Sequence, residues 1–253
     1  MNTQDPNPPP QIGIQDILAL TIWECFAGYE YLTGEIGVGA ERVCLMGESA
    51  GGHLALAFLA TLARGVVGSF SFSSSSLDGD GDEDWGKKER VKEKREEGHP
   101  RPGSLILLSP WIDLSLSSPM VDILEKKDFM SRSFLRRMGR ELLRSDPGLS
   151  SLFGDFASRS MERGSWGRIL PCKTWVSAGG DEIFVDDIVR FVDCTREDDV
   201  EVELRVEPGK CHSWQSGEAF LSARRFLDIS IQCEGVELMP GLVGVAGVIA
   251  GFV

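Results

Sequence analysis

The stretch CLMGESAGGHLALAFLATLA, residues 44–63, decides the fold class, because a short apolar run changes there into a long alanine-rich one. Residues 41–46, ERVCLM, predict a buried strand, and residues 50–64 predict a buried helix. A serine stands between two glycines where the patterns meet, in the order Gly47, Glu48, Ser49, Ala50, Gly51. The sequence therefore predicts a strand, a tight turn and a helix, with Ser49 on the turn.

The order Gly-x-Ser-x-Gly in this context is typical of a nucleophile elbow. Such a turn holds the serine in a strained backbone conformation with its hydroxyl exposed above the sheet. Side chains two positions before and two positions after the serine would collide, so we expect both Gly47 and Gly51 to be required. The helix begins at the serine, so its unpaired N–H groups and its dipole favour negative charge there. We therefore predict the Ala50 N–H as an oxyanion donor.

A serine nucleophile needs a base, and the chain contains three histidines. His53 follows Ser49 on the same helix, so we expect it to pack around the turn as a structural residue. His99 lies beside Pro100, and we expect it to be exposed. His212 lies in a loop after a predicted strand and before the last predicted helix, which fits the chain order Ser…Asp…His. We therefore predict His212 as the base.

The base needs an acid that orients it. Asp181 follows the predicted strand CKTWVSA across two glycines, at the strand end where doubly wound sheets place their sites. Glu182 would point in another direction from the turn. Asp186 falls on the next helix and is expected to cap it or face solvent. Asp181 is therefore the predicted acid, with Glu182 and Asp186 as its rivals.

Predicted strands alternate with predicted helices along the 253 residues, which indicates an α/β fold with a mostly parallel sheet flanked by helices. We expect one domain over residues 11–230. Residues 68–99 are rich in Ser, Gly and Asp and then densely charged, so we expect a low-complexity insertion there. Residues 231–253 form an apolar tail that we expect to lie outside the domain, and its glycine-rich end is too short to span a bilayer.

The net charge of −13 argues against nucleic acid as a partner, because phosphate binding favours a basic surface. The six cysteines show no metal-ligand spacing, so we interpret them as reduced core thiols and expect no metal. Residues 1–10 lack the basic and apolar regions of a signal peptide, which favours a cytoplasmic location. The oligomeric state stays open.

The ordered motifs GESAGGHLAL, LLSPWIDLS, SAGGDEIFVDDI and PGKCHSW resemble the hormone-sensitive-lipase-like branch of the α/β-hydrolase fold, in particular its fungal esterases. The resemblance covers about residues 11–228 apart from the insertion. It implies a Ser49–Asp181–His212 triad, with Glu48 helping to arrange the site. It also implies hydrolysis of small-molecule carboxylic esters through an acyl-enzyme, without a metal or an organic cofactor.

The chain departs from that family in one respect. Relatives carry an H-G-G-G-type segment on an early loop, which supplies most of the oxyanion hole, and the 48 residues before Ser49 contain no such segment. We therefore expect an N-terminally truncated version of the fold. Two alternatives to an active esterase stay open. One is an inactive or unstable remnant, or a non-catalytic binding protein on the same fold. The other is a peptidase or amidase.

Overall fold

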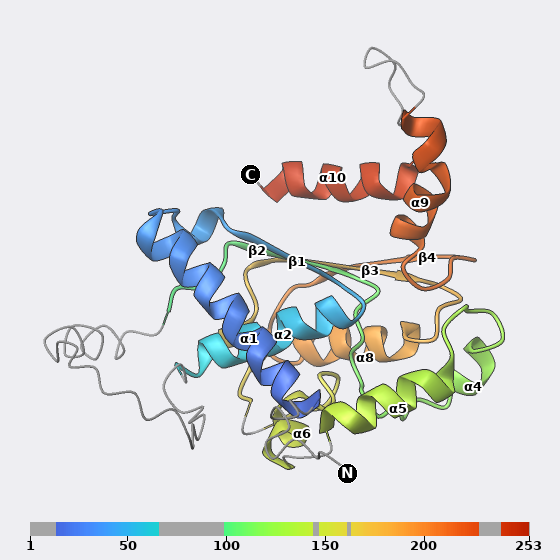
Figure 1. Cartoon of the computed structure of the whole chain (residues 1–253), viewed down its shortest axis with the longest axis horizontal. Helices are drawn as coiled ribbons and strands as arrows, with labels where there is room; N and C mark the ends of the chain where they lie inside the picture. Colours follow the sequence, from blue (N-terminus) through green and yellow to red (C-terminus); the bar gives the residue numbers. More distant parts are fainter. Residues whose placement is uncertain (1–13, 66–98, 144–146, 161–162, 228–238, 253) are drawn as a thin grey trace, which may run out of the picture.

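The computed structural model describes residues 14–65, 99–143, 147–160, 163–227 and 239–252. Apart from His99, the insertion expected at 68–99 lies outside the described residues, so its structure stays a prediction. The described residues form a sheet with helices on both faces (Figure 1).

The sheet has the order β1-β2-β3-β4 in the described part of the chain, and every neighbouring pair is parallel. This arrangement confirms the predicted α/β class with its parallel sheet. All four strands therefore end at the same edge, which places the residues that follow them close together. The strands are β1 Cys44–Glu48, β2 Ser104–Leu108, β3 Lys173–Gly179 and β4 Glu203–Glu207.

The first strand differs in its bounds from the sequence prediction. The strand predicted at 41–46 begins only at Cys44, because Ala40–Arg42 forms a 3₁₀ helix. The second strand, β2, ends at Leu108, and the next residue, Ser109, has a φ of 44°, which is outside the range of an extended strand.

Helices connect the strands, and the helix predicted at residues 50–64 is confirmed as α2. The described helices are α1 Ile14–Glu30, η1 Tyr31–Glu35, η2 Ala40–Arg42, α2 Ala50–Ala63, α4 Val121–Leu124, α5 Arg132–Leu143, α6 Pro147–Phe153, α7 Trp166–Ile169, α8 Val185–Arg196, α9 Trp214–Leu227 and α10 Pro240–Phe252.

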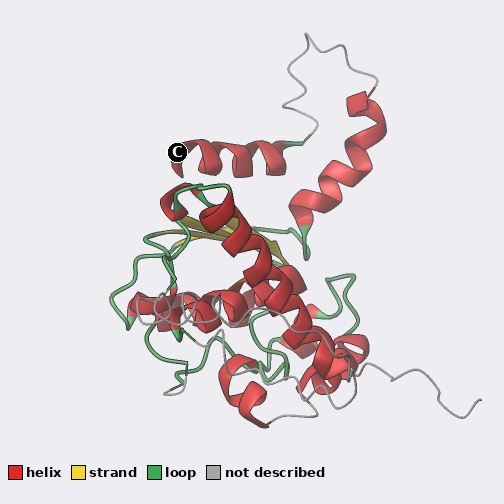
Figure 2. Ribbon diagram, turned by 60° about the vertical axis from the view of Figure 1, so that its left-hand side comes forward, coloured by secondary structure: helices red, strands yellow, loops and turns green. Residues whose placement is uncertain are grey.

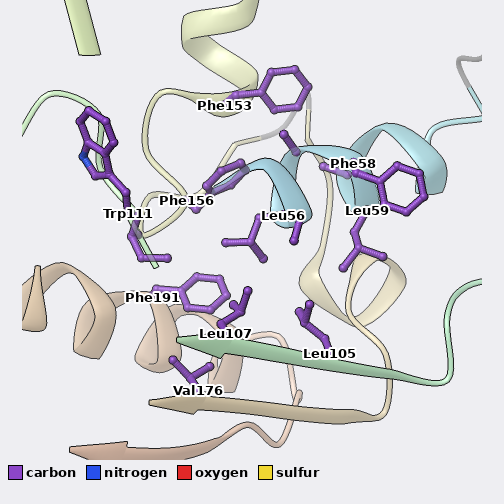
Figure 3. Close-up of a cluster of buried hydrophobic side chains, with 14 of the residues drawn as sticks. Leu56, Phe58, Leu59, Leu105, Leu107, Trp111, Phe153, Phe156, Val176 and Phe191 are labelled. Carbon is purple, nitrogen blue, oxygen red and sulfur yellow. The ribbon is translucent and has the colours of Figure 1, made fainter. Parts of the chain in front are cut away.

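The main core lies between the sheet and the layer that contains α1, α2 and α8. Side chains of β2 alternate across the sheet, so Leu105 and Leu107 join this core while Ile106 and Leu108 face the other side. Figure 3 shows Leu105 and Leu107 pointing toward Leu56 of α2. Because all five β2 residues are buried, β2 is a central strand covered on both faces.

The opposite face of the sheet is covered by α10, which differs from the expectation that the apolar tail lies outside the domain. Val245 of α10 is buried against Ile106, Leu108 and Trp175 of the sheet. Figures 1 and 2 show α10 lying along this face, while α9 leans outward from it. The physical reason is that β2 and β3 present apolar side chains on this face, and an apolar helix removes them from water.

The described cysteines are free thiols, but they are not all in the core. Cys194 is buried, whereas Cys44 and Cys172 are exposed, so the interpretation as core residues is wrong for these two. Of the helices that the structure describes, none is both long and apolar enough to cross a membrane.

Candidate active site

Ser49 occupies the turn between β1 and α2 with φ 55° and ψ −120°, a conformation that a non-glycine residue rarely adopts. Backbone hydrogen bonds hold this turn in place. The Ser49 N–H donates to the Leu108 carbonyl oxygen at 3.0 Å, and the Trp111 N–H donates to the Ser49 carbonyl oxygen at 3.0 Å. The strained turn is therefore held by the last residue of β2 and by the segment that follows it, as expected for a conformation that the surroundings must impose.

The glycines around Ser49 have unequal roles. A Cβ at Gly47 would lie 2.4 Å from the carbonyl oxygen of Gly51, and a Cβ at Gly52 would lie 2.7 Å from Pro110 Cβ. A Cβ at Gly51, in contrast, would meet nothing within 4 Å. The expected collision is therefore found at Gly47 but not at Gly51, because the first turn of α2 points that position away from the strand. Gly52 takes the second close contact, which the Gly-x-Ser-x-Gly pattern does not reveal.

The structure brings His212 to Ser49. The His212 Nε2 lies 2.8 Å from the Ser49 Oγ, although 163 positions separate the two residues. The imidazole is 3 % exposed and packs edge-on against Phe184 at 5.0 Å between ring centroids, with Phe129 at 6.0 Å. Burial lowers the pKa of His212 to about 4, while the nearby Asp128 carboxylate acts in the opposite direction. At neutral pH the imidazole is therefore uncharged and able to accept a proton.

Asp181 lies beside the histidine loop but does not bond to His212. Its N–H donates to the Lys210 carbonyl oxygen at 2.9 Å, which places its backbone next to the segment that leads to His212. Its carboxylate instead accepts a hydrogen bond from Lys127 Nζ at 2.8 Å. The His212 Nδ1 is buried and has no hydrogen-bond partner among the described residues. The described geometry thus joins two of the three predicted triad residues and leaves the role of Asp181 as a prediction.

The two rival acids are held elsewhere. Glu182 is fully buried, and its Oε2 accepts from Ser109 Oγ at 2.6 Å and from the Gly179 N–H at 2.7 Å. Burial raises the pKa of Glu182 to about 8. Asp186 lies on α8 and accepts from Ser118 Oγ at 2.5 Å. Neither contact involves His212.

Asp128 also belongs to the site, although nothing in the sequence singles it out. Its Oδ2 accepts from the Ile183 N–H at 2.8 Å and its Oδ1 accepts from the Phe129 N–H at 2.7 Å, so it ties the α4–α5 connection to the turn after β3. Its charge acts on His212, Glu182 and Cys211. In the sequence it is one polar residue in a mixed segment, and no motif marks it.

Glu48 and Ala50 flank the serine. The Glu48 Oε2 accepts from Ser216 Oγ of α9 at 2.8 Å, which links the strand before Ser49 to the helix after His212. Ala50 is the first residue of α2, so its N–H has no acceptor within the helix and is available at the serine. Glu48 thus has a positioning contact, and the Ala50 N–H stays the predicted oxyanion donor.

The other histidines lie away from the serine hydroxyl. His53 is buried, its Nδ1–H donates to the Trp111 carbonyl oxygen at 2.8 Å, and burial lowers its pKa to about 4. This is the structural position that the sequence predicts. His99 is only partly exposed, since it lies 3.5 Å from a Glu30 carboxylate oxygen and packs near Phe26, so the expectation of an exposed residue holds only in part. Within the described ranges, no three His, Cys, Asp or Glu side chains form a group that could hold a metal ion.

Comparisons with known proteins concern the family and the fold of the chain. The sequence model of a family described as alpha/beta hydrolase fold matches residues 89–216, half of the chain, and the match contains His212 but begins after Ser49. A curated protein named esterase from Acinetobacter venetianus is 29% identical over 125 residues, which are 47% of this chain and 37% of that protein.

Proteins named as esterases are also found among the solved structures of similar fold. An esterase of the bacterial hormone-sensitive lipase family has a TM-score of 0.59 at 20% identity, over 91% of this chain and 59% of that one. A putative esterase from Staphylococcus aureus has a TM-score of 0.56 at 21% identity, over 88% of this chain and 63% of that one. The chain thus spans less than two thirds of these proteins. The truncation expected from the absent oxyanion segment stays a prediction.

Proposed function

The chain belongs to the α/β-hydrolase fold family, and from this premise we propose that it is a serine hydrolase of small-molecule carboxylic esters. One observation carries the proposal: the 2.8 Å contact between Ser49 Oγ and His212 Nε2 on a strained turn at a helix start. A hydroxyl at this distance from a neutral imidazole is the arrangement of an activated nucleophile. The esterase names of the similar proteins support the ester class of substrate.

In the proposed reaction, Ser49 Oγ attacks the ester carbonyl carbon while His212 Nε2 takes the hydroxyl proton. The Ala50 N–H at the start of α2 stabilises the oxyanion. His212 then donates the proton to the leaving alcohol, which yields an acyl-enzyme on Ser49. In the second half, a water molecule attacks the acyl carbon while His212 takes its proton. His212 then returns this proton to the Ser49 Oγ as the bond to the acyl carbon breaks, which releases the carboxylic acid. Asp181 is the proposed partner of the imidazolium.

The test compares the purified chain with Ser49→Ala and His212→Ala on p-nitrophenyl butyrate, with circular dichroism spectra to establish folding. Turnover by the native chain that Ser49→Ala abolishes supports the proposal. A fluorophosphonate probe adds a readout that needs no turnover, since it reacts with an activated serine. A folded native chain that neither hydrolyses the ester nor reacts with the probe refutes the proposal.

A non-catalytic ester-binding protein is the second candidate, and one observation favours it. Asp181 is engaged by Lys127, and the His212 Nδ1 has no partner in the described residues. Without a carboxylate at Nδ1 the imidazolium that forms during catalysis is less stabilised. The same experiment separates the candidates, because a binding protein would retain the ester without releasing p-nitrophenol. Hydrolysis of p-nitrobutyranilide beside the ester tests the amidase alternative.

A further inference from the structure

A buried hydrogen-bond chain connects the turn after β2 to the loop that carries His212. The Ser109 Oγ lies 2.6 Å from the Glu182 Oε2 and accepts from the Ser213 N–H at 3.1 Å. That N–H belongs to the peptide bond that joins Ser213 to His212. One hydroxyl therefore contacts both the turn after β3 and the backbone of the predicted base.

The residues at both ends of this contact have unusual backbones. Ser109 has a φ of 44° and Ser213 a φ of 52°, so both occupy the left-handed region that serine seldom adopts. Such a conformation is strained for serine and persists only where the surroundings impose it. The Ser109 N–H donates to the Ser177 carbonyl oxygen at 2.7 Å, which anchors the first of these turns to β3.

Glu182 provides the fixed end of this hydrogen-bond chain. It is fully buried, and the Gly179 N–H at 2.7 Å holds the same oxygen that contacts Ser109. Its other oxygen, Oε1, is buried without a partner in the described residues. Burial raises the pKa of Glu182 to about 8, so the carboxyl is uncharged at neutral pH. A buried carboxyl that costs desolvation and contacts a single hydroxyl and a single N–H suggests a role beyond packing.

We propose that Glu182 and Ser109 are positioning residues of the ester hydrolase proposed above, which clamp the His212–Ser213 peptide so that Nε2 stays on Ser49 Oγ. The clamp matters because none of the described carboxylates contacts the His212 Nδ1. The orientation of the imidazole therefore depends on its backbone, on Phe184 and Phe129 beside the ring and on Ser49 itself. Neither clamp residue touches the reacting atoms.

The test uses Ser109→Ala, which removes both contacts of the hydroxyl with little change of volume. Thr195→Val is the matched control, because Thr195 is fully buried on α8 and its hydroxyl donates only to the Val192 carbonyl oxygen at 2.7 Å, within its own helix. A displacement of about 1 Å at a reacting group costs on the order of 100-fold in rate. We therefore expect Ser109→Ala to lower kcat by about 10- to 100-fold with KM within about twofold, and Thr195→Val to change neither.

A second pair of variants tests the fixed end. Glu182→Leu removes the acceptor and should lower kcat like Ser109→Ala. Glu182→Gln keeps one oxygen that accepts both hydrogen bonds, so it should restore kcat to about the native value. If Glu182→Leu does not fold, the comparison of Ser109→Ala with Glu182→Gln still decides the question. Equal kcat in Ser109→Ala and Thr195→Val overturns the clamp.

Amide hydrogen exchange at Ser213 separates this proposal from the proposed function. The native amide should be protected by the Ser109 Oγ, and Ser109→Ala should speed its exchange at least tenfold while α8 amides keep their rates. A native chain without turnover refutes the esterase and the catalytic role of the clamp with it, whatever the exchange shows. Turnover with unchanged Ser213 exchange in Ser109→Ala refutes the clamp and leaves the esterase standing.

Discussion

Replacing Gly47 by alanine tests the close packing of the turn around Ser49. The added Cβ would lie 2.4 Å from the Gly51 carbonyl oxygen, whereas ordinary contact begins at 3.4 Å, so the turn must open by about 1 Å. The contacted atoms belong to the backbone, which cannot move aside like a flexible side chain. Overpacking of this kind costs about 1–3 kcal/mol, and we expect the upper end for Gly47→Ala.

Gly51→Ala is the matched control, four positions along the chain. Its Cβ meets nothing within 4 Å, and alanine favours the helix by up to about 1 kcal/mol over glycine. Each kcal/mol of stability changes the melting temperature by about 2–4 °C. Thermal unfolding followed by circular dichroism should therefore show a melting temperature about 4–12 °C lower in Gly47→Ala, and an unchanged or slightly higher one in Gly51→Ala. Hydrolysis of p-nitrophenyl butyrate should fall by on the order of 100-fold in Gly47→Ala only. Equal behaviour of the two variants would refute the reasoning.

Three further predictions concern stability and charge. Because the pKa of Glu182 is raised in the folded chain, the free energy of unfolding should fall as pH rises from 4.5 to about 8. In urea titrations, Glu182→Gln should remove about 3–5 kcal/mol of this pH dependence. The prediction is contradicted if the free energy of unfolding of the native chain and of Glu182→Gln depends on pH in the same way. Val245→Asp should lower the melting temperature by about 6–12 °C, whereas Ala246→Asp, at an exposed position, should not. If the tail lay outside the domain, the two variants would have equal melting temperatures. Lys127→Ala should raise kcat/KM by at most about fivefold, because an exposed ion pair is worth about 1 kcal/mol or less; a fall in kcat/KM contradicts this.

The sequence allowed the strand, turn and helix around Ser49 to be predicted because the motif constrains the local backbone directly. His212 could be selected for a similar reason, since the carboxyl ends of parallel strands meet at one edge. The orientation of the Asp181 side chain could not be predicted. It depends on Lys127, which lies 54 positions away in the chain, and no local pattern records that contact.

Two other features depend on surfaces that exist only after folding. The apolar tail has no partner in the sequence, but Ile106, Leu108 and Trp175 form an apolar face once the sheet is assembled, and α10 covers it. The free space at Gly51 and the contact at Gly52 depend on where α2 leaves the turn and on the position of Pro110. A motif gives the residue types at such positions, but the contacts of each follow from the packing around it.

The position of Asp181 bears on how the proposed mechanism stabilises the His212 imidazolium. Its contact with Lys127 joins two partly exposed side chains, and such a pair contributes about 1 kcal/mol or less. A hydrogen bond to a charged group contributes about 1.5–3 kcal/mol, and the imidazolium formed when His212 takes the Ser49 proton is such a group. The Asp181 backbone is already bonded to Lys210, two residues before His212, so Asp181 lies beside the loop that carries the imidazole. We therefore propose that the Asp181 carboxylate contacts Lys127 while His212 is neutral and contacts His212 once the imidazole is charged, so that the acid would be engaged when the reaction requires it.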